Sequence, residues 1–316
     1  MLDRRRPLTA EELRRLAAAL GPAARIVRSE PLLGGLDWGT YALEVEAREG
    51  IRSLVVRRFD GSGERPARSA DRLWAALTAL GSTDLPVPRP VLRDDGHLIG
   101  APAIVMTRCE GAIRPPPADP AGWIRAYAAA LLAVHAADLG RLSTTLPSCT
   151  DRRAVLGRFL ELPATGEARP AWDRVAGALL DHVHALVEVP PVLRHRDFWF
   201  GNTLWTGDRV TGIVDWSGAC IGDPRGDVAY ARLDVHLVLG AEAAGQFQRA
   251  YERQRGGAIE LAWWELCAAI DALVWLPDWV EGYHEVGLKD LSLSIARERL
   301  DAFIDDSMER LIRGAR

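Results

Sequence analysis

Lysine is nearly missing from this chain of 316 residues, because Lys289 is the one lysine among its 39 basic residues. A Walker A loop holds nucleotide phosphates with a lysine that stands between a glycine and a serine or threonine. Lys289 follows Leu288 and precedes Asp290, so this class of phosphate-binding site is excluded. The Gly-x-Ser-x-Gly elbow of α/β-hydrolases and the His-Glu-x-x-His helix of zinc proteases are also missing from the sequence.

Cysteine is scarce and widely spaced. The four cysteines are Cys109, Cys149, Cys220 and Cys267. None has the close cysteine or histidine partner that a zinc site requires. The spacing therefore predicts reduced, mostly buried thiols and no disulfide bond.

Long apolar runs and a strong charge of one sign are absent as well. No apolar stretch approaches the roughly 18 residues of a membrane span, and the arginine-rich N-terminal segment lacks the apolar core of a signal peptide. With 39 basic and 43 acidic residues the net charge is -4, which argues against nucleic acid or an anionic membrane as a partner. We therefore expect a cytoplasmic protein.

The composition that is present suits two folded lobes. Apolar residues make up 48% and charged residues 26% of the chain, which excludes disorder and predicts a core larger than one small domain needs.

A first lobe is predicted over residues 1–107. Thr9 and Glu12 form a capping box that opens a helix of about eleven residues, an accessory to the lobe, and Gly21 ends it. The apolar period then changes to two, which is typical of strands. The lobe should contain five antiparallel strands and one further helix, with strands at 26–33, 41–47, 53–59, 91–93 and 103–107 and the helix at 67–80.

A mostly helical second lobe is predicted over residues 108–316. Its exception is a hairpin of two short strands, 203–205 and 210–214, around a Gly207-Asp208 turn. The fold class is therefore α+β, with a small antiparallel sheet in the first lobe and helices in the second. The second lobe should carry both the catalytic hairpin and the pocket for an acceptor.

Three oxygen-bearing side chains meet at this hairpin. Asp197 and Asn202 belong to the string His-Arg-Asp-Phe-Trp-Phe-Gly-Asn before the first strand, and Asp215 follows the second strand. Phosphoryl transfer uses such a set: a carboxylate accepts the proton of the attacking hydroxyl, and oxygen ligands hold Mg²⁺. Asp197 suits the first role, and Asn202 and Asp215 suit the second.

These motifs resemble the aminoglycoside phosphotransferase and choline kinase branch of the protein-kinase-like fold, from about Leu32 to Tyr230. The strings Ile-Val-Asp-Trp at 213–216 and Gly-Asp-Pro-Arg-Gly-Asp-Val-Ala at 222–229 are similar to the family's metal-binding and following segments. The resemblance implies a bilobal kinase that uses ATP, or GTP, with Mg²⁺. It also implies structural roles for three residues that support the catalytic loop, namely His195, Asp223 and Asp227.

The same resemblance points to nucleotide-binding residues in the first lobe. Gly34 and Gly35 lie between two strands, where missing side chains let backbone N–H groups approach phosphates. Arg57 stands where the family usually has a phosphate-pairing lysine, and a guanidinium differs from an ammonium in geometry. The glutamate that usually pairs with this lysine is replaced by Leu73; Asp71 is the nearest acid and Glu64 the next.

The strand at 103–107 resembles the strand that, in this family, leads into the hinge between the two lobes. Met106 would then face the back of an adenine pocket, or would simply belong to the core. The backbone from Thr107 to Cys109 would bond the base.

The acceptor pocket is predicted from acids and tryptophans in the later helices. Carboxylates and aromatic rings together bind cationic, ring-bearing molecules such as an aminoglycoside, another antibiotic or a small amino alcohol. The alternative is a helix pair with a solvated acidic face and a tryptophan core. The candidate residues are Trp199, Asp271, Trp275, Asp278 and Trp279.

Two rival functions remain open. A protein kinase is suggested by the His-Arg-Asp string, but seven residues between Asp215 and Asp223 are too few for a peptide-docking segment. A nucleotide-binding pseudokinase that serves as a scaffold is suggested by Arg57 and Leu73. The complete set of Asp197, Asn202 and Asp215 favours catalysis over the scaffold role.

Overall fold

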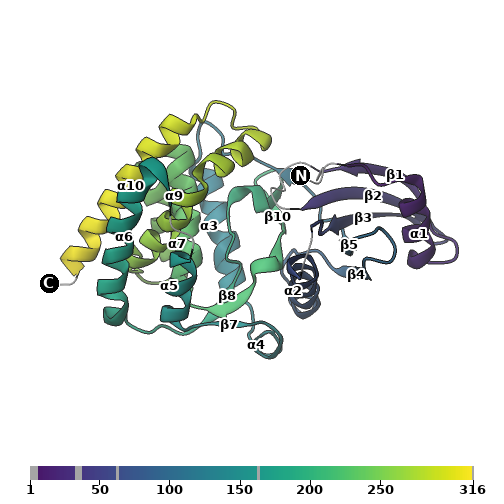
Figure 1. Cartoon of the computed structure of the whole chain (residues 1–316), viewed down its shortest axis with the longest axis horizontal. Helices are drawn as coiled ribbons and strands as arrows, with labels where there is room; N and C mark the ends of the chain where they lie inside the picture. The colour runs from purple at the N-terminus through teal and green to yellow at the C-terminus, as the bar shows by residue number, and fades with distance from the viewer. Residues whose placement is uncertain (1–5, 33–37, 62–63, 162–163, 315–316) are drawn as a thin grey trace. The chain divides into compact units, whose positions relative to one another are not determined.

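The computed structural model describes residues 6–32, 38–61, 64–161 and 164–314, and the chain divides into two compact units (Figure 1). The first, here called the sheet unit, contains Met1–Gly111 and Thr211–Gly218. The second, the helical unit, contains Ala112–Val210 and Ala219–Arg316. The short segment that carries Asp215 thus groups with the sheet unit, although it follows the hairpin turn in the sequence.

The sheet unit is built on a five-stranded antiparallel sheet with the order β1-β2-β3-β5-β4. The predicted α+β class, with its small antiparallel sheet, is confirmed. The elements are α1 (Ala10–Leu20), β1 (Arg25–Pro31), β2 (Gly39–Ala47), β3 (Gly50–Arg58), α2 (Arg65–Leu80), β4 (Pro90–Asp95), β5 (Pro102–Thr107) and the short 3-10 helix η4 (Trp216–Gly218).

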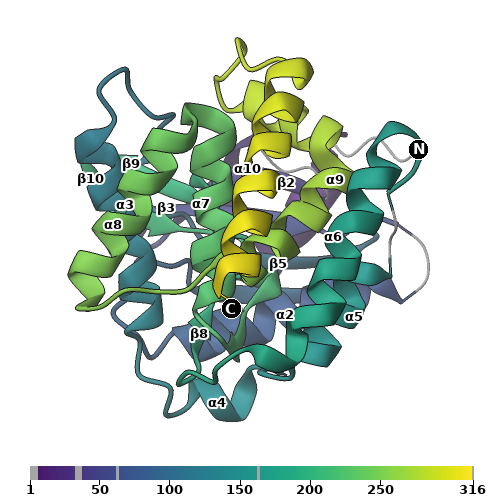
Figure 2. The ribbon, with the colours of Figure 1, turned by 90° about the vertical axis from the view of Figure 1, so that its left-hand side faces the viewer.

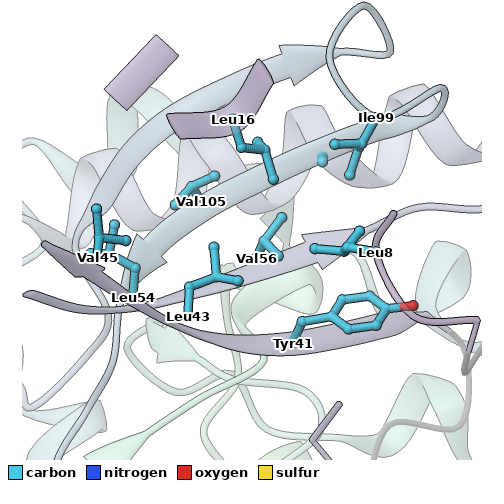
Figure 3. Packing of buried hydrophobic residues seen from close by; sticks show 10 residues of the cluster. Leu8, Leu16, Tyr41, Leu43, Val45, Leu54, Val56, Ile99 and Val105 are labelled. Carbon is cyan, nitrogen blue, oxygen red and sulfur yellow. The ribbon is translucent and has the colours of Figure 1, made fainter. Parts of the chain in front are cut away.

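One face of this sheet forms an apolar core with α1. Side chains alternate between the two faces of a strand, so Leu43 and Val45 of β2 point the same way as Val56 of β3. Figure 3 shows these residues gathered with Leu16 of α1, and all of them are buried. Because Arg57 follows Val56, its side chain belongs to the opposite face of β3.

Local signals in the sequence account for the start of α1. The side chain of Thr9 accepts a hydrogen bond from the backbone N–H of Glu12 at 3.2 Å. The Glu12 carboxylate in turn accepts one from the backbone N–H of Thr9 at 2.7 Å. This is the predicted capping box, and it satisfies two N–H groups that the helix cannot satisfy internally.

The helical unit contains long helices and two small sheets. Helices α9 and α10 pack against each other, and α7 contacts α8, α9 and α10 (Figure 2). Its elements are β6 (Ala112–Ile113), α3 (Ala121–His135), α4 (Leu142–Thr145), β7 (Ser148–Cys149), α5 (Arg152–Leu160), η1 (Gly166–Ala168), α6 (Arg169–His182), η2 (Val183–Ala185), β8 (Val192–Arg194), η3 (Phe200–Asn202), β9 (Thr203–Thr206), β11 (Cys220–Gly222), α7 (Arg225–Leu239), α8 (Ala241–Arg255), α9 (Ala262–Glu285) and α10 (Leu293–Gly314).

The predicted hairpin is present as β9 and β10 (Arg209–Ile213), and β10 leads from the helical unit into the sheet unit. Gly207 has a φ of 59°, a left-handed conformation that costs glycine little and most other residues more. The turn therefore forms where the Gly207-Asp208 pair predicted it.

The prediction that the cysteines are all reduced is wrong for two of them. Cys149 and Cys220 form a disulfide bond, with their Cα atoms 6.1 Å apart. The cause is a non-local pairing: β7 lies parallel to β11, with Cys149 opposite Gly222. A sequence separation of 71 residues gives no sign of this proximity. Cys109 and Cys267 are free.

No helix in the described part of the chain is both long and apolar enough to cross a lipid bilayer.

Candidate active site

The loop that carries Asp197 is held by a buried carboxylate from α7. Asp227 is fully buried and accepts hydrogen bonds from the backbone N–H groups of His195 at 2.6 Å and Arg196 at 3.2 Å. The side-chain Nε of Arg194 donates to the same carboxylate at 2.9 Å. These bonds fix the backbone where Arg196 adopts a φ of 70°, a conformation that is unfavourable for a residue with a side chain.

The electrostatics of this support depend on Arg194. Burial opposes ionisation of Asp227, but the charge of Arg194 and the contact with His135 outweigh it, so the pKa of Asp227 lies well below its usual range. Arg194 in turn requires Gly226, because a Cβ atom there would lie 2.1 Å from its Nη2. The first turn of α7 is therefore shaped around one guanidinium group.

The Asp197 carboxylate is oriented by two neutral donors. Its Oδ2 accepts a hydrogen bond from Nδ2 of Asn202 at 2.9 Å, and its Oδ1 accepts one from the hydroxyl of Tyr230 at 3.1 Å. Nδ2 of Asn202 also donates to the backbone carbonyl of Asp197 at 2.9 Å. These hydrogen bonds fix the direction of the carboxylate, and Asp197 is half-buried.

The aromatic residues after Asp197 pack around the loop. The ring of Trp199 covers Gly201 so closely that a Cβ atom at position 201 would lie 2.3 Å from it. Trp199 also meets Tyr283 edge to face, with ring centroids 5.7 Å apart. Trp199 therefore supports the loop between Asp197 and Asn202, and its place in an acceptor pocket stays a prediction.

A second buried carboxylate, which the sequence analysis missed, holds the far end of this loop. Asp234 accepts hydrogen bonds from the backbone N–H of Phe200 at 3.1 Å and from the hydroxyls of Tyr283 at 2.9 Å and Tyr127 at 3.4 Å. Burial raises the pKa of Asp234 to about 7 despite these bonds. A signal existed in the sequence: Asp227, Tyr230 and Asp234 are spaced three and four apart, which places them on one face of a helix.

The sheet unit holds its own carboxylate, Asp215, against Arg57. The two groups form a double contact, with Nη1 of Arg57 at 2.7 Å from Oδ1 of Asp215 and Nη2 at 2.9 Å from Oδ2. The hydroxyl of Ser217 also donates to Oδ1 at 2.9 Å. Asp215 has a φ of 63°, and such strained non-glycine residues cluster at functional sites.

The acids that the sequence offered as partners for Arg57 are engaged elsewhere. Asp71 pairs with Arg93 at 2.9 Å, and Glu64 pairs with Arg68 on the same helix. Leu73 is buried in the sheet unit. Among the described ion pairs, Arg57 therefore contacts Asp215 in place of an acid from α2.

The donor set suits a hard divalent cation. Asn202 uses its side-chain nitrogen for Asp197, which leaves its amide oxygen as the atom that it could offer to a metal. Asp215 supplies carboxylate oxygens, and Mg²⁺ prefers one or two such ligands together with phosphate oxygens. No cluster of three or more His, Cys, Asp or Glu side chains occurs in the described ranges.

The predicted nucleotide-binding residues of the sheet unit are partly described. Gly34 and Gly35 lie outside the described residues. Met106 is buried in β5, 7% exposed. The backbone N–H of Thr107 already donates a hydrogen bond to the carbonyl oxygen of Arg89 at 2.9 Å. Within this segment, a nucleotide base could therefore bond only to the N–H of Cys109 and to backbone carbonyl groups.

The predicted acceptor residues divide into two groups. Asp271 lines a cavity of about 130 Å³ in the helical unit, and Trp279 meets Tyr230 edge to face at 5.6 Å. Trp275 and Asp278 are exposed on α9. The other lining residues of the cavity are Val155, Arg158, Phe159, Arg194, Arg196, Gly226, Tyr230, Trp264, Cys267 and Ala268.

Comparison with known proteins gives the family. Residues 28–265 match a family model described as "Phosphotransferase enzyme family". The chain belongs to this family.

Among curated relatives, acyl-CoA dehydrogenase family member 10 of Mus musculus is 28% identical over 203 residues, which cover 59% of this chain and 19% of that protein. Homoserine kinase of Methylorubrum populi is 30% identical over 155 residues, which cover 45% of each chain. This phosphotransferase thus spans less than half the length of either relative.

Solved structures show the same fold. A thermostable mutant of aminoglycoside phosphotransferase APH(4)-Ia, in a ternary complex with AMP-PNP and hygromycin B, superposes with a TM-score of 0.65 at 19% identity. The match covers 94% of this chain and 98% of that one. The phosphotransferase described here therefore has the protein-kinase-like fold.

Proposed function

We propose that this protein transfers the γ-phosphoryl group of ATP, with Mg²⁺, to a hydroxyl group of a small molecule, and that Asp197 accepts the hydroxyl proton. The observation that carries the proposal is the fixed direction of the Asp197 carboxylate between Asn202 and Tyr230. A proton acceptor must be held within hydrogen-bond reach of the attacking group, and the donors Asn202 and Tyr230 fix the direction of this carboxylate.

The residues that the family resemblance assigns to Mg²⁺ and the nucleotide are proposed for the same roles in this chain. Asn202 and Asp215 would ligate the metal, which when bound neutralises charge on the transferring phosphoryl group. Arg57 would contact phosphate oxygens, and Gly34 and Gly35 would approach them with backbone N–H groups. The AMP-PNP complex of the structural relative supports the use of ATP, with GTP as the alternative. Met106, Thr107 and Cys109 would surround the base.

The acceptor is proposed to be a small hydroxylated molecule because the relatives act on or bind such molecules. One relative is a homoserine kinase, and the structural relative holds hygromycin B. Aminoglycoside-like antibiotics and small amino alcohols are the acceptor classes that the sequence resemblance implies. The cavity beside Asp197, lined by Asp271 and Tyr230, is where we place the acceptor.

One observation favours a second candidate, a nucleotide-binding scaffold with little catalysis. Arg57 contacts both oxygens of Asp215, so a metal ion must displace a guanidinium to bind there. If that displacement fails, nucleotide could bind without productive phosphoryl transfer.

The test compares wild type with Asp197→Asn, which keeps the side-chain shape. ATP and Mg²⁺ are supplied with a panel of hydroxylated small molecules, and phosphorylated products are identified by mass spectrometry. We expect the substitution to lower turnover by roughly 10² to 10⁴ because the proton acceptor is lost. Asp173→Asn, on the exposed surface of α6 where it pairs with Arg169 at 2.8 Å, is the matched control. Undiminished turnover in Asp197→Asn would remove Asp197 from this role, and nucleotide binding without any product would favour the scaffold.

A further inference from the structure

The cavity beside the catalytic loop lies wholly within the helical unit. Its walls come from α5, from the residues before Asp197, from the first turns of α7 and from α9. The cavity has a volume of about 130 Å³. On the same measure, one water molecule needs about 10–15 Å³, so the cavity can hold a part of a ligand with about ten non-hydrogen atoms.

The cavity opens next to the proposed base. Tyr230 lines it and donates a hydrogen bond to Oδ1 of Asp197 at 3.1 Å. Arg196, another lining residue, is the chain neighbour of Asp197. A molecule bound in the cavity can therefore present a hydroxyl group to Asp197 while the rest of it contacts the wall.

The wall contains several guanidinium groups. Its lining includes three guanidinium groups, from Arg158, Arg194 and Arg196, and one carboxyl group, from Asp271. Arg194 is paired with Asp227 at 2.9 Å and lies over the ring of Trp264 at 5.5 Å, so it forms a fixed part of the wall. The side chains of Arg158 and Arg196 reach solvent.

The charges in the wall act on one another. Burial, together with the charges of Arg158 and Arg194, lowers the pKa of Arg196 to about 10, against the attraction of Asp227 and Asp271. Burial, together with repulsion from Asp197, raises the pKa of Asp271 to about 7, against the attraction of Arg196 and Arg158. An anion bound to Arg158 and Arg196 would relieve the repulsion between their charges, whereas a cation would be repelled by both and attracted by Asp271 and Asp197.

We propose that the acceptor is a hydroxycarboxylate, whose carboxylate binds Arg158 and Arg196 in this cavity while its hydroxyl faces Asp197. The inference rests on the proposed kinase function and deepens it. Guanidinium groups bind carboxylates through paired, charge-assisted hydrogen bonds, which fix both the position and the orientation of the ligand. The acceptor charge is thus opposite to the cationic class expected from the sequence.

The reaction balances without a further reactant. The hydroxyl oxygen of the acceptor forms a bond to the γ-phosphorus of ATP, and its proton passes to the Asp197 carboxylate. The bond between the γ-phosphorus and the bridging oxygen breaks, and ADP leaves with the electron pair. The products are ADP, a phosphorylated hydroxycarboxylate and one proton.

The kinetic test uses a homologous series of straight-chain hydroxycarboxylates, their primary amides and the amino alcohols of matching length. We expect wild type to phosphorylate one or more carboxylates with a kcat/KM at least about tenfold above the matched amide, since a charge-assisted hydrogen bond contributes about 1.5–3 kcal/mol. Arg158→Gln should raise KM for the carboxylate about 10-fold to 100-fold and reduce the carboxylate-to-amide ratio toward one. Arg158→Lys should restore part of that ratio.

The control is Arg153→Gln, because Arg153 is an exposed arginine on the same helix, next to His184, and does not line the cavity. It should keep the wild-type ratio. A preference for amides or amino alcohols over carboxylates, or an unchanged ratio in Arg158→Gln with normal thermal stability, would overturn the proposal.

A binding measurement separates this inference from the proposed function. The best hydroxycarboxylate is titrated into wild type, Arg158→Gln and Arg196→Lys without nucleotide, and binding is followed by ligand-observed NMR. Binding that both substitutions weaken supports the carboxylate site; if no phosphorylated product forms with ATP and Mg²⁺, the kinase function fails while the site stands. Transfer to uncharged or cationic alcohols, with no carboxylate binding, would preserve the kinase function and overturn the carboxylate site. Neither binding nor transfer would contradict both.

Discussion

The two units hold their central carboxylates by different means. In the helical unit, Asp197 is oriented by the neutral groups of Asn202 and Tyr230. In the sheet unit, Asp215 is held at both oxygens by the guanidinium of Arg57. A neutral donor leaves a carboxylate able to accept a proton, whereas a guanidinium occupies it until another cation takes its place. The difference matches the roles proposed for the two residues, proton acceptor and metal ligand.

The same contrast recurs in the two carboxylates that support the catalytic loop. Asp227 is paired with Arg194, and its pKa lies well below the usual range although burial opposes ionisation. Asp234 accepts hydrogen bonds from a backbone N–H and two tyrosine hydroxyls, and burial raises its pKa to about 7. At equal burial, the presence of an arginine decides the direction of the shift.

The largest expected effect comes from exchanging the two central carboxylates for amides. Asp197→Asn should lower turnover by roughly 10² to 10⁴ and leave Mg²⁺-dependent nucleotide binding intact. Asp215→Asn should remove the Mg²⁺ dependence of nucleotide binding, because a charged metal ligand is lost. Steady-state rates and calorimetric titrations of nucleotide with and without Mg²⁺ check the pair. If both substitutions impair metal-dependent binding equally, the division of roles is wrong.

The next effect concerns stability. Asp227→Asn leaves the buried Arg194 without its counter-charge, which should cost about 3–5 kcal/mol of unfolding free energy. Because the folded-state pKa of Asp227 is depressed, its contribution is present above the unfolded-state pKa of about 4 and is lost as pH falls below it. Urea denaturation of wild type and variant at neutral and acidic pH measures both effects. Asp173→Asn provides a surface control, and an equal response of the two variants would contradict the buried pair.

Asp234 should show the opposite dependence on pH. Its raised pKa of about 7 means that the folded state binds a proton more tightly than the unfolded state, in which an aspartate has a pKa of about 4. The stability of wild type relative to Asp234→Asn should therefore decrease by about 2 kcal/mol as pH rises from about 5 to about 7. Denaturation curves at several pH values measure this difference. A difference that stays constant across this interval would show that Asp234 titrates normally.

The smallest expected effect concerns Arg57. Arg57→Met removes the cation that competes for Asp215, so Mg²⁺ alone should bind about tenfold more tightly, or about 1.4 kcal/mol. Nucleotide affinity should fall at the same time, because a phosphate contact is lost. Arg68→Met, which removes an exposed arginine that pairs with Glu64 on α2, should change neither value. Weaker Mg²⁺ binding in Arg57→Met would show that the arginine assists the metal site.

The sequence predicted the elements whose signals are local. The capping box at Thr9 and Glu12 opens α1, and the turn at Gly207 forms the hairpin. Period-two patterns located all five strands of the sheet, with boundaries that differ by a few residues. Asp197 and Asn202 could be singled out together because they lie in one short string and interact directly.

Contacts between distant segments could not be predicted in this way. Asp215 meets Arg57 across a separation of 158 residues, and the disulfide joins Cys149 to Cys220 through a parallel pairing of very short strands. Asp234 was overlooked because its partners Tyr127 and Tyr283 lie on other helices, far away in the sequence. Such partners are set by tertiary packing, which a single sequence does not encode as a pattern.

The missing side chain of Gly226 has a consequence for how this protein can vary. A single methyl group at that position would collide with Arg194, and Arg194 shares Asp227 with the backbone of the catalytic loop. An alanine at position 226 would thus displace the Arg194 guanidinium and, through Asp227, loosen the catalytic loop, although it would not contact the loop itself. Variation at position 226 is therefore constrained by where the Arg194 guanidinium must lie to hold Asp227.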